Sequence, residues 1–158
     1  NENLNVNIKL SVEDIINIDE LNNLILNIGL EQGDITLTNS RIMWKNDLEL
    51  SMTEGILSYD NDEIYLIGRV LVNANNIDNF YKSFQVKKVK RKKINELEFD
   101  FIYNLNQNKF QFDNIKIDKK TNQKIDKFID AYNSKGKIFT NKVTFKNFIN
   151  DFFDIYSG

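Results

Sequence analysis

The residues with the strongest chemical character form one dense cationic run between positions 87 and 93. Six of its seven side chains are positively charged: Lys87, Lys88, Lys90, Arg91, Lys92 and Lys93. Such a run can bind phosphate, either on lipid head groups or on nucleic acid. Nucleic acid is the weaker candidate, because nearby aromatic side chains fall on positions that we expect to be buried. A solvated linker is the favoured interpretation, because three carboxylates follow at Glu96, Glu98 and Asp100.

A second chemical feature is the acidic stretch from Asp60 to Glu63. The order Asp-Asn-Asp suggests a calcium loop, but the EF-hand pattern needs glycine at its sixth position and glutamate at its twelfth. Tyr65 and Leu71 stand there, so we interpret the stretch as a polar turn and expect no metal site. Catalysis by two carboxylates alone requires that they meet in a cleft, so a hydrolase stays open as a third hypothesis.

The chain contains neither cysteine nor histidine among its 158 residues. This composition excludes thiol nucleophiles, disulfides, histidine-based triads and almost every zinc site. The phosphate-binding pattern GxxxxGK[ST] is absent as well. We therefore expect no catalytic residues, no enzyme activity and no cofactor.

Aromatic side chains recur at alternate positions late in the chain. They form a ladder of five residues: Phe99, Phe101, Tyr103, Phe110 and Phe112. The interpretation that we favour is a core face covered by the protein's own helices. The alternative is an open apolar groove that holds acyl chains, because an exposed apolar patch of this length marks an interaction site.

The ladder belongs to an alternation that recurs along most of the chain. From Leu97 to Leu105 every odd position is apolar and the even positions are polar except Ile102, which is the period of a strand with one buried face. Residues 64–72 are apolar on both faces, so we expect this strand to lie centrally or beneath a helix. Polar and glycine residues predict tight turns at four places: 32–34, 46–47, 60–62 and 106–108.

Two segments are harder to assign from this alternation. Val12–Asp19 is expected to form a short helix or a bend, and Ile56–Tyr59 a short strand of its own.

Three later segments have apolar residues at the spacing of an amphipathic helix. Their stripes are Ile77, Phe80, Tyr81 and Phe84; Ile125, Phe128, Ile129 and Tyr132; and Phe145, Phe148, Ile149, Phe152, Phe153 and Tyr156.

These patterns together predict an α+β fold dominated by β-structure. We expect an antiparallel meander sheet with one apolar face, one amphipathic helix before a hairpin and two C-terminal helices. Residues 1–120 are expected to form the sheet module, with the inserted helix at about 75–86, and residues 121–158 a helical cap. The length fits a single domain or a fragment of a longer protein.

The composition is strongly biased. The chain has 25 Asn, 21 Ile and 18 Lys against 3 Arg and no Pro, which is typical of an A/T-rich genome. The net charge of -2 gives no overall electrostatic preference for nucleic acid. No apolar run is long enough to cross a membrane, and the start at Asn1 indicates a processed product or an excised piece.

Several segments in order resemble the C-terminal part of AsmA-like proteins (the AsmA/TamB superfamily) from α-proteobacteria with A/T-rich genomes. The segments are 32–40, with its glycine, acidic residue and alternating strand, then 64–68, 79–85, 99–104 and 114–118, with the Lys/Arg-rich link between the third and fourth. The resemblance covers residues 20–156 and includes no single diagnostic motif.

The resemblance implies a non-enzymatic, periplasmic module that takes part in envelope biogenesis and phospholipid transport to the outer membrane. Its apolar sheet face would line or cap a lipid groove, and an inner-membrane anchor would lie upstream. Phospholipid, a membrane surface or envelope proteins would be the partners. The alternative is a protein-interaction or structural domain whose sheet face is covered by its own helices and which binds through edge strands or the basic link.

Overall fold

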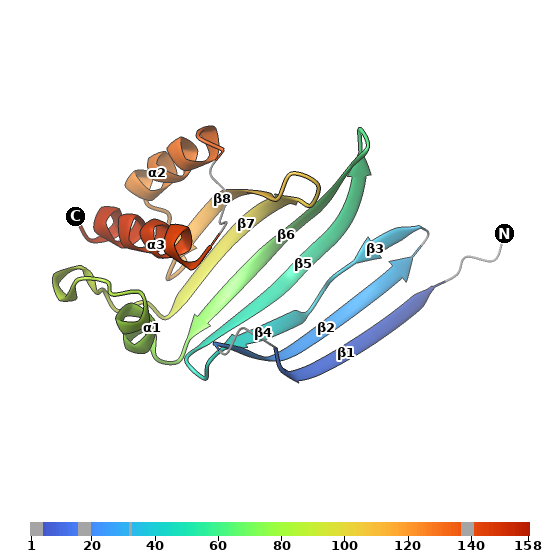
Figure 1. Ribbon diagram of the computed structural model, residues 1–158, viewed down its shortest axis with the longest axis horizontal. Helices are drawn as coiled ribbons and strands as arrows, with labels where there is room; N and C mark the ends of the chain where they lie inside the picture. Colours follow the sequence, from blue (N-terminus) through green and yellow to red (C-terminus); the bar gives the residue numbers. More distant parts are fainter. Residues whose placement is uncertain (1–4, 16–19, 32, 137–140) are drawn as a thin grey trace.

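Alternating apolar and polar residues build one large sheet in the computed structural model, which describes residues 5–15, 20–31, 33–136 and 141–158 (Figure 1). Within these residues, eight strands form a single antiparallel sheet and three α-helices pack against it. The fold is therefore α+β and dominated by β-structure. One helix precedes the last hairpin and two follow it, as predicted.

The strands fill the first three quarters of the chain. They are β1 (Val6–Asp14), β2 (Leu21–Glu31), β3 (Asp34–Thr36), β4 (Ser40–Trp44), β5 (Leu48–Asp60), β6 (Glu63–Ala74), β7 (Glu96–Asn104) and β8 (Lys109–Ile117). The helices are α1 (Ile77–Ser83), α2 (Gln123–Ser134) and α3 (Lys142–Ser157), with a short 3-10 turn, η1, at Lys88–Lys90.

Most neighbouring strands in the sheet are also neighbours in the sequence, the exceptions being the β2–β4 and β3–β5 pairs. The order is β1-β2-β3-β5-β6-β7-β8, and β4 pairs with β2 and β5 beside β3. The predicted turn at 60–62 joins β5 to β6, and Asn61 and Asp62 have φ values of 49° and 63° there. Asn and Asp tolerate this left-handed conformation better than most residues, which favours tight hairpins. The strand 64–72 lies inside β6, in the interior of the sheet, as expected.

Two of the expected elements are wrong. Val12–Asp14 completes β1 and forms no helix or bend; residues 16–19 of that segment lie outside the described residues. Ile56–Tyr59 is not a separate strand but the last part of the 13-residue β5. The apolar alternation changes parity within β5 because the register to β6 shifts between Met52 and Glu54. A β-bulge inserts one extra residue there without ending the strand.

A second bulge lies on the same level of the sheet. The register of β7 with β8 shifts between Glu98 and Asp100, and Asn114 on β8 has φ 51°. Bulges increase the local twist of a strand. Between the two bulges the strands come close at Gly68. A Cβ added there would lie 2.5 Å from the Glu54 carbonyl oxygen and 3.1 Å from Cε1 of Phe101. The sheet therefore bends along a band in which only glycine fits at position 68.

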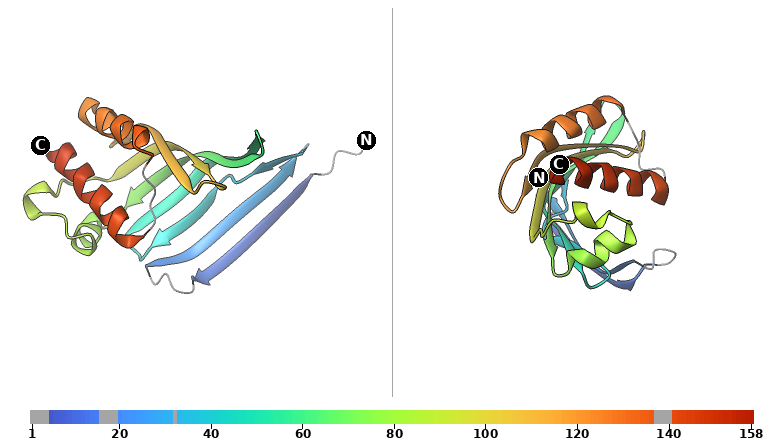
Figure 2. Two further views of the ribbon diagram at one scale, coloured as in Figure 1. Left: turned by 45° about the horizontal axis from the view of Figure 1, so that its top comes forward. Right: turned by 90° about the vertical axis from the view of Figure 1, so that its left-hand side faces the viewer.

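The bent sheet has two chemically different faces. Figure 2 shows that the sheet is curved and that α1 and α3 lie on its concave side. The concave face carries apolar residues of β6 such as Leu66, Val70 and Val72, whereas the outer face carries Arg69 of β6 and Asp100 of β7. This alternation confirms the expected sheet with one predominantly apolar face.

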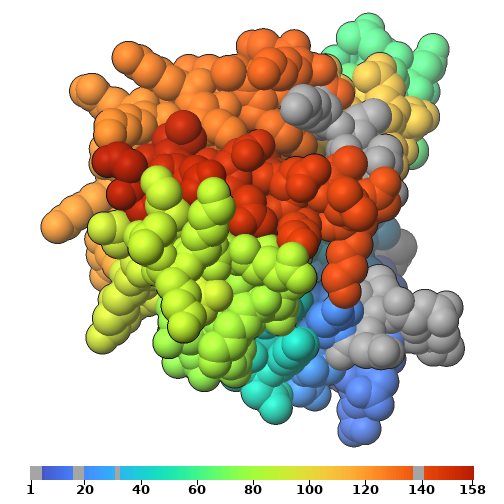
Figure 3. Space-filling model, turned by 60° about the vertical axis from the view of Figure 1, so that its left-hand side comes forward, coloured from blue at the N-terminus to red at the C-terminus, as the bar shows by residue number. Residues whose placement is uncertain are grey.

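The helices bury one end of the concave face. Figure 3 shows α3 between α1 and α2, and their apolar stripes form a single core with the sheet. Its most deeply buried members include Tyr81, Val86, Ile117, Ile125, Ile129, Phe152 and Phe153. All three predicted stripes therefore face the core, as amphipathic helices require.

Asparagine side chains start the two C-terminal helices. Asn122 accepts hydrogen bonds from the amides of Lys124 and Ile125, and Asn141 forms a capping box with Thr144. Asn76 occupies the cap position of α1 but makes no side-chain hydrogen bond there. Among the described residues, no helix is long and apolar enough to span a bilayer.

Candidate ligand-binding face

The five aromatic residues of the ladder lie on the concave face. Phe101 pairs with Phe112 across β7 and β8, and Tyr103 pairs with Phe110. Residues directly opposite each other in a sheet project to the same side. The alternation in the sequence therefore placed these side chains on one surface correctly, although it did not show what lies above them.

The helices cover one part of the ladder. The ring of Phe112 stacks on that of Phe148 in α3, with centroids 5.8 Å apart, and packs edge-on against Phe99 at 5.7 Å. Phe101 is only 5% exposed and lies over Gly68. Phe99, Phe101 and Phe112 therefore belong to the packed interior, and this part of the ladder fits the interpretation of a covered core face.

The other part of the ladder extends past the helices. Tyr103 and Phe110 stack with centroids 4.2 Å apart, and both remain partly exposed. From Tyr103 the pairing register continues through apolar residues on β6, β5, β3, β2 and β1 to the other edge of the sheet. This row, which we call the apolar strip, consists of Phe110, Tyr103, Leu66, Leu57, Ile35, Leu30 and Val6.

Further apolar side chains flank the apolar strip on the concave face. Tyr59 and Ile64 pair beside it and are 70% and 36% exposed. On β1, Ile8 and Leu10 are 55% and 48% exposed. Half-buried or exposed apolar residues on adjacent strands form a contiguous patch, and contiguous patches mark interaction sites more strongly than isolated residues do.

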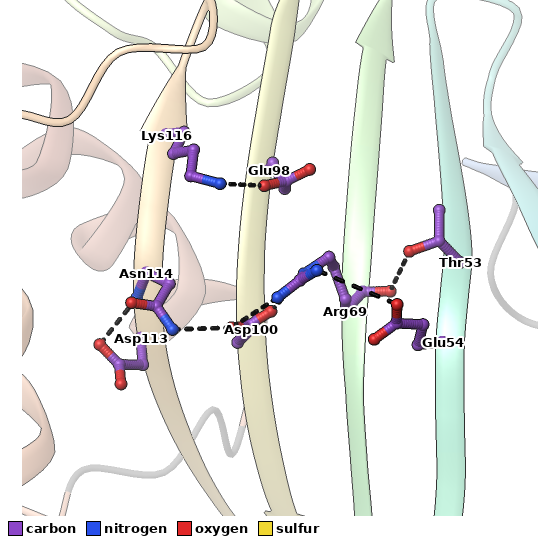
Figure 4. Close-up of polar contacts among 8 residues, drawn as sticks. All are labelled: Thr53, Glu54, Arg69, Glu98, Asp100, Asp113, Asn114 and Lys116. Atoms are coloured by element: carbon purple, nitrogen blue, oxygen red, sulfur yellow. Dashed lines mark hydrogen bonds and ion pairs between the residues drawn. The ribbon is translucent and has the colours of Figure 1, made fainter.

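The outer face carries a row of charged pairs over the bulged band (Figure 4). Arg69 donates two hydrogen bonds to Asp100, from Nε to Oδ1 at 2.7 Å and from Nη2 to Oδ2 at 3.2 Å. Asn114 donates to the same carboxylate at 2.8 Å, and Lys116 pairs with Glu98 at 2.8 Å. The hydrogen bonds from Arg69 hold the pKa of Asp100 below its usual value. A general acid needs a raised pKa, so Asp100 is not suited to that role.

A depression of about 660 Å³ lies over this charged row. Its walls combine Asp100, Asp113 and Arg69 with an isoleucine from each of three strands, Ile56, Ile67 and Ile102. Among the described residues, no group of three acidic side chains is arranged to hold a metal ion. The hydrogen bonds and ion pairs of the row connect β6, β7 and β8 and stabilise the bent sheet.

The acidic stretch at 60–63 is a hairpin turn, as interpreted from the sequence. Glu63 accepts hydrogen bonds from Tyr65 at 2.6 Å, Gln107 at 2.6 Å and Asn104 at 2.7 Å. These donors lower the pKa of the Glu63 carboxyl, with the Tyr65 hydroxyl contributing most. The carboxylate thus joins the β5–β6 hairpin to the β7–β8 hairpin.

The cationic run forms the link between α1 and β7, at the helical end of the molecule (Figure 1). Lys87, Lys88, Lys92 and Lys93 are exposed, and Val89 between them is 82% exposed. The turn after β8 adds two exposed lysines, Lys119 and Lys120. Sequence reasoning missed this addition, because the hairpin brings together residues that are distant along the chain.

Comparison of this chain with known protein families, curated proteins and solved structures gives no match. The geometry of the concave face therefore carries the functional argument by itself, and the resemblance to AsmA-like proteins rests on the sequence segments given above.

Proposed function

We propose that this chain is a non-enzymatic lipid-binding module in which the apolar strip holds acyl chains of a phospholipid. The observation that carries the proposal is that the apolar surface continues from β8 to β1, across seven of the eight described strands, beyond the region covered by the helices. An extended, partly exposed apolar surface on a concave face is suited to a flexible apolar ligand.

The dimensions of the apolar strip fit such a ligand. The strip crosses from β8 to β1 over six strand-to-strand steps, which at about 4.8 Å each gives about 29 Å. An acyl chain in one leaflet of a bilayer spans about 15 Å, half of the hydrocarbon thickness. The strip is therefore about twice as long as one extended acyl chain, so it can hold the full length of such a chain.

The arrangement of the helices supports a terminal role in a longer groove. They fill the concave face at one end and leave it open at the other, where Ile8 and Leu10 on β1 are exposed. Together with the sequence resemblance, this supports an AsmA-like module that caps a lipid groove in the periplasm, anchored to the inner membrane by a segment outside this chain. Envelope proteins and phospholipid would be its partners.

A protein-interaction domain is the second candidate function. Stacking of Phe148 on Phe112 favours it, because a sheet face that is already occupied by its own helices needs no lipid there. In this case binding would use the exposed edge of β1, to which a partner can add a strand.

Site-specific photo-crosslinking tests the lipid proposal. A photoreactive phenylalanine analogue at Leu57 or Tyr103 lies on the apolar strip, whereas the same group at Ser58 lies next to Leu57 on the opposite face. After delipidation and exposure to labelled phosphatidylglycerol vesicles, we expect label at Leu57 and Tyr103 well above that at Ser58. Equal labelling at Leu57 and Ser58 would refute the proposal and leave the protein-interaction candidate.

A further inference from the structure

We infer that the link between α1 and β7 is a membrane-docking loop, which places Val89 in the interface of an anionic bilayer while the surrounding lysines bind its head groups. This surface is separate from the apolar strip, and the inference does not depend on lipid binding by the strip.

The fold holds this loop in a defined shape. Val86 and Ile94 at its two ends are 2% and 5% exposed, so both ends are anchored in the core. The hydroxyl of Tyr81 donates a hydrogen bond to the Lys92 carbonyl at 2.7 Å, and Arg91 Nε donates to the Val86 carbonyl at 2.9 Å. The exposure of Val89 is thus a property of an anchored loop, which presents one apolar side chain to solvent at little cost in ordering.

The charge around Val89 is strongly positive. Lys87, Lys88, Lys92 and Lys93 form no ion pair within the described part of the chain. Lys90 lies against the end of α3, where its Nζ donates to the Asp154 carbonyl at 3.4 Å. Since the whole chain has a net charge of -2, this cluster is a local concentration of positive charge on a slightly acidic protein.

A second cationic segment, Lys119 and Lys120, is held beside the loop by the neighbouring residue Asp118. The Asp118 carboxylate accepts hydrogen bonds from the amides of Asn95 at 2.9 Å and Glu96 at 3.0 Å, directly after the loop. This contact fixes the turn that carries Lys119 and Lys120 at the same end of the sheet. Asp118 is directed toward backbone amides, so it is engaged in holding this turn in place.

The chemistry of the loop favours a membrane over nucleic acid. An exposed apolar side chain among lysines matches the interfacial region of an anionic bilayer, where apolar groups enter the acyl boundary and lysines remain at the phosphates. Single-stranded nucleic acid is usually bound by aromatic side chains that stack on bases. The run from Lys87 to Lys93 contains no aromatic residue.

Vesicle co-sedimentation of the full chain tests the inference. We expect binding to vesicles of phosphatidylcholine with one quarter phosphatidylglycerol, and its loss with pure phosphatidylcholine or in high salt, because surface charges are screened. The double variant Lys87→Ala/Lys88→Ala should bind about 25-fold more weakly, at about fivefold for each lysine. The matched control Lys9→Ala/Lys127→Ala removes the same charge from exposed positions on β1 and α2 and should bind as the unaltered chain does.

Substitution of the apolar residue separates a membrane from other polyanions. Val89→Asp should weaken vesicle binding by at least tenfold, and Val89→Leu should retain it, whereas neither change alters the fold because Val89 is exposed. Equal weakening by the control pair, or vesicle binding unaffected by Val89→Asp, would overturn the inference. Tighter binding to single-stranded RNA than to anionic vesicles would also overturn it. None of these results bears on crosslinking at Leu57, so the two proposals fail separately.

Discussion

The side chain of Asn133 in α2 takes the place of a neighbouring strand beside Phe112 of β8. Its Nδ2 donates a hydrogen bond to the Phe112 carbonyl at 2.7 Å, and its Oδ1 accepts one from the Phe112 amide at 3.1 Å. Both backbone groups of Phe112 therefore have a hydrogen-bond partner on α2 at this edge. The contact also fixes α2 along β8, next to the stacked rings of Phe112 and Phe148.

Removal of this side-chain amide should destabilise the edge. Asn133→Ala removes two part-buried hydrogen bonds to the Phe112 backbone, which should lower the free energy of unfolding by about 1–3 kcal/mol. Hydrogen exchange at the Phe112 amide should accelerate by more than exchange in β6. Asp130→Ala, on an exposed position of the same helix, is the matched control. No change in Phe112 exchange in Asn133→Ala would show that the contact is dispensable.

The ion pair of Arg69 and Asp100 predicts a defined pH dependence of stability. Its hydrogen bonds lower the pKa of folded Asp100 below the usual 3.8. A lowered folded pKa means that the stabilisation is present above the unfolded pKa and disappears as the pH falls through the folded one. Asp100→Asn should therefore reduce stability by about 1 kcal/mol at pH 6, and this difference should shrink below pH 4.

Denaturant unfolding at several pH values measures this difference. Asp126→Asn provides a matched comparison, because Asp126 is exposed on α2 and lies in no ion pair of the described residues. A constant difference between the unaltered chain and Asp100→Asn down to pH 2 would contradict the assignment of this stabilisation to the charged form of Asp100.

Gly68 should not tolerate a side chain. A Cβ there would lie 2.5 Å from the Glu54 carbonyl oxygen, which belongs to the backbone and cannot rotate away. We expect Gly68→Ala to lower the free energy of unfolding by about 2–3 kcal/mol. Gly33→Ala adds a Cβ with nothing within 4 Å, so its cost comes from its φ of +96° alone; thermal melts in which both variants lose equal stability would exclude a collision at Gly68.

The hydroxyl of Tyr81 should be required for the shape of the membrane-docking loop. Tyr81 is fully buried, and burial raises the pKa of its phenol, so the group stays protonated and donates to Lys92 at every pH of interest. Tyr81→Phe should cost about 1 kcal/mol of stability and speed hydrogen exchange between residues 86 and 94. Tyr132→Phe, in α2, is the aromatic control; loop exchange that is equal in both variants would contradict this role.

Much of the fold follows from local patterns in the sequence. Alternation and turn residues predicted the hairpins, and the three apolar stripes predicted the helices. The error at Ile56–Tyr59 has a specific cause. A bulge and a strand end both interrupt alternation, and only pairing to β6 reveals that β5 continues through Thr53. The same parity change between Phe112 and Ile115 marks the bulge in β8.

The candidate site was only partly predictable. The parity of β7 and β8 placed the five aromatic residues on one face, but the position of Phe148 above Phe112 depends on how α3 packs from a distant part of the chain. The apolar strip likewise depends on register, because Leu57, Ile35 and Leu30 align only through strand pairing. Contacts between distant segments are not encoded in the period of either segment.

The two edges of the sheet differ in whether a further strand can pair with them. At β8 the edge is occupied by Asn133, so a further strand could pair at Phe112 only by displacing α2. On the edge of β1 that faces away from β2, none of the described residues forms a strand pair. Each strand added there would lengthen the apolar strip by about 4.8 Å. Extension of the sheet past Phe112 on β8 would thus require α2 to move, whereas extension at β1 would displace none of the helices.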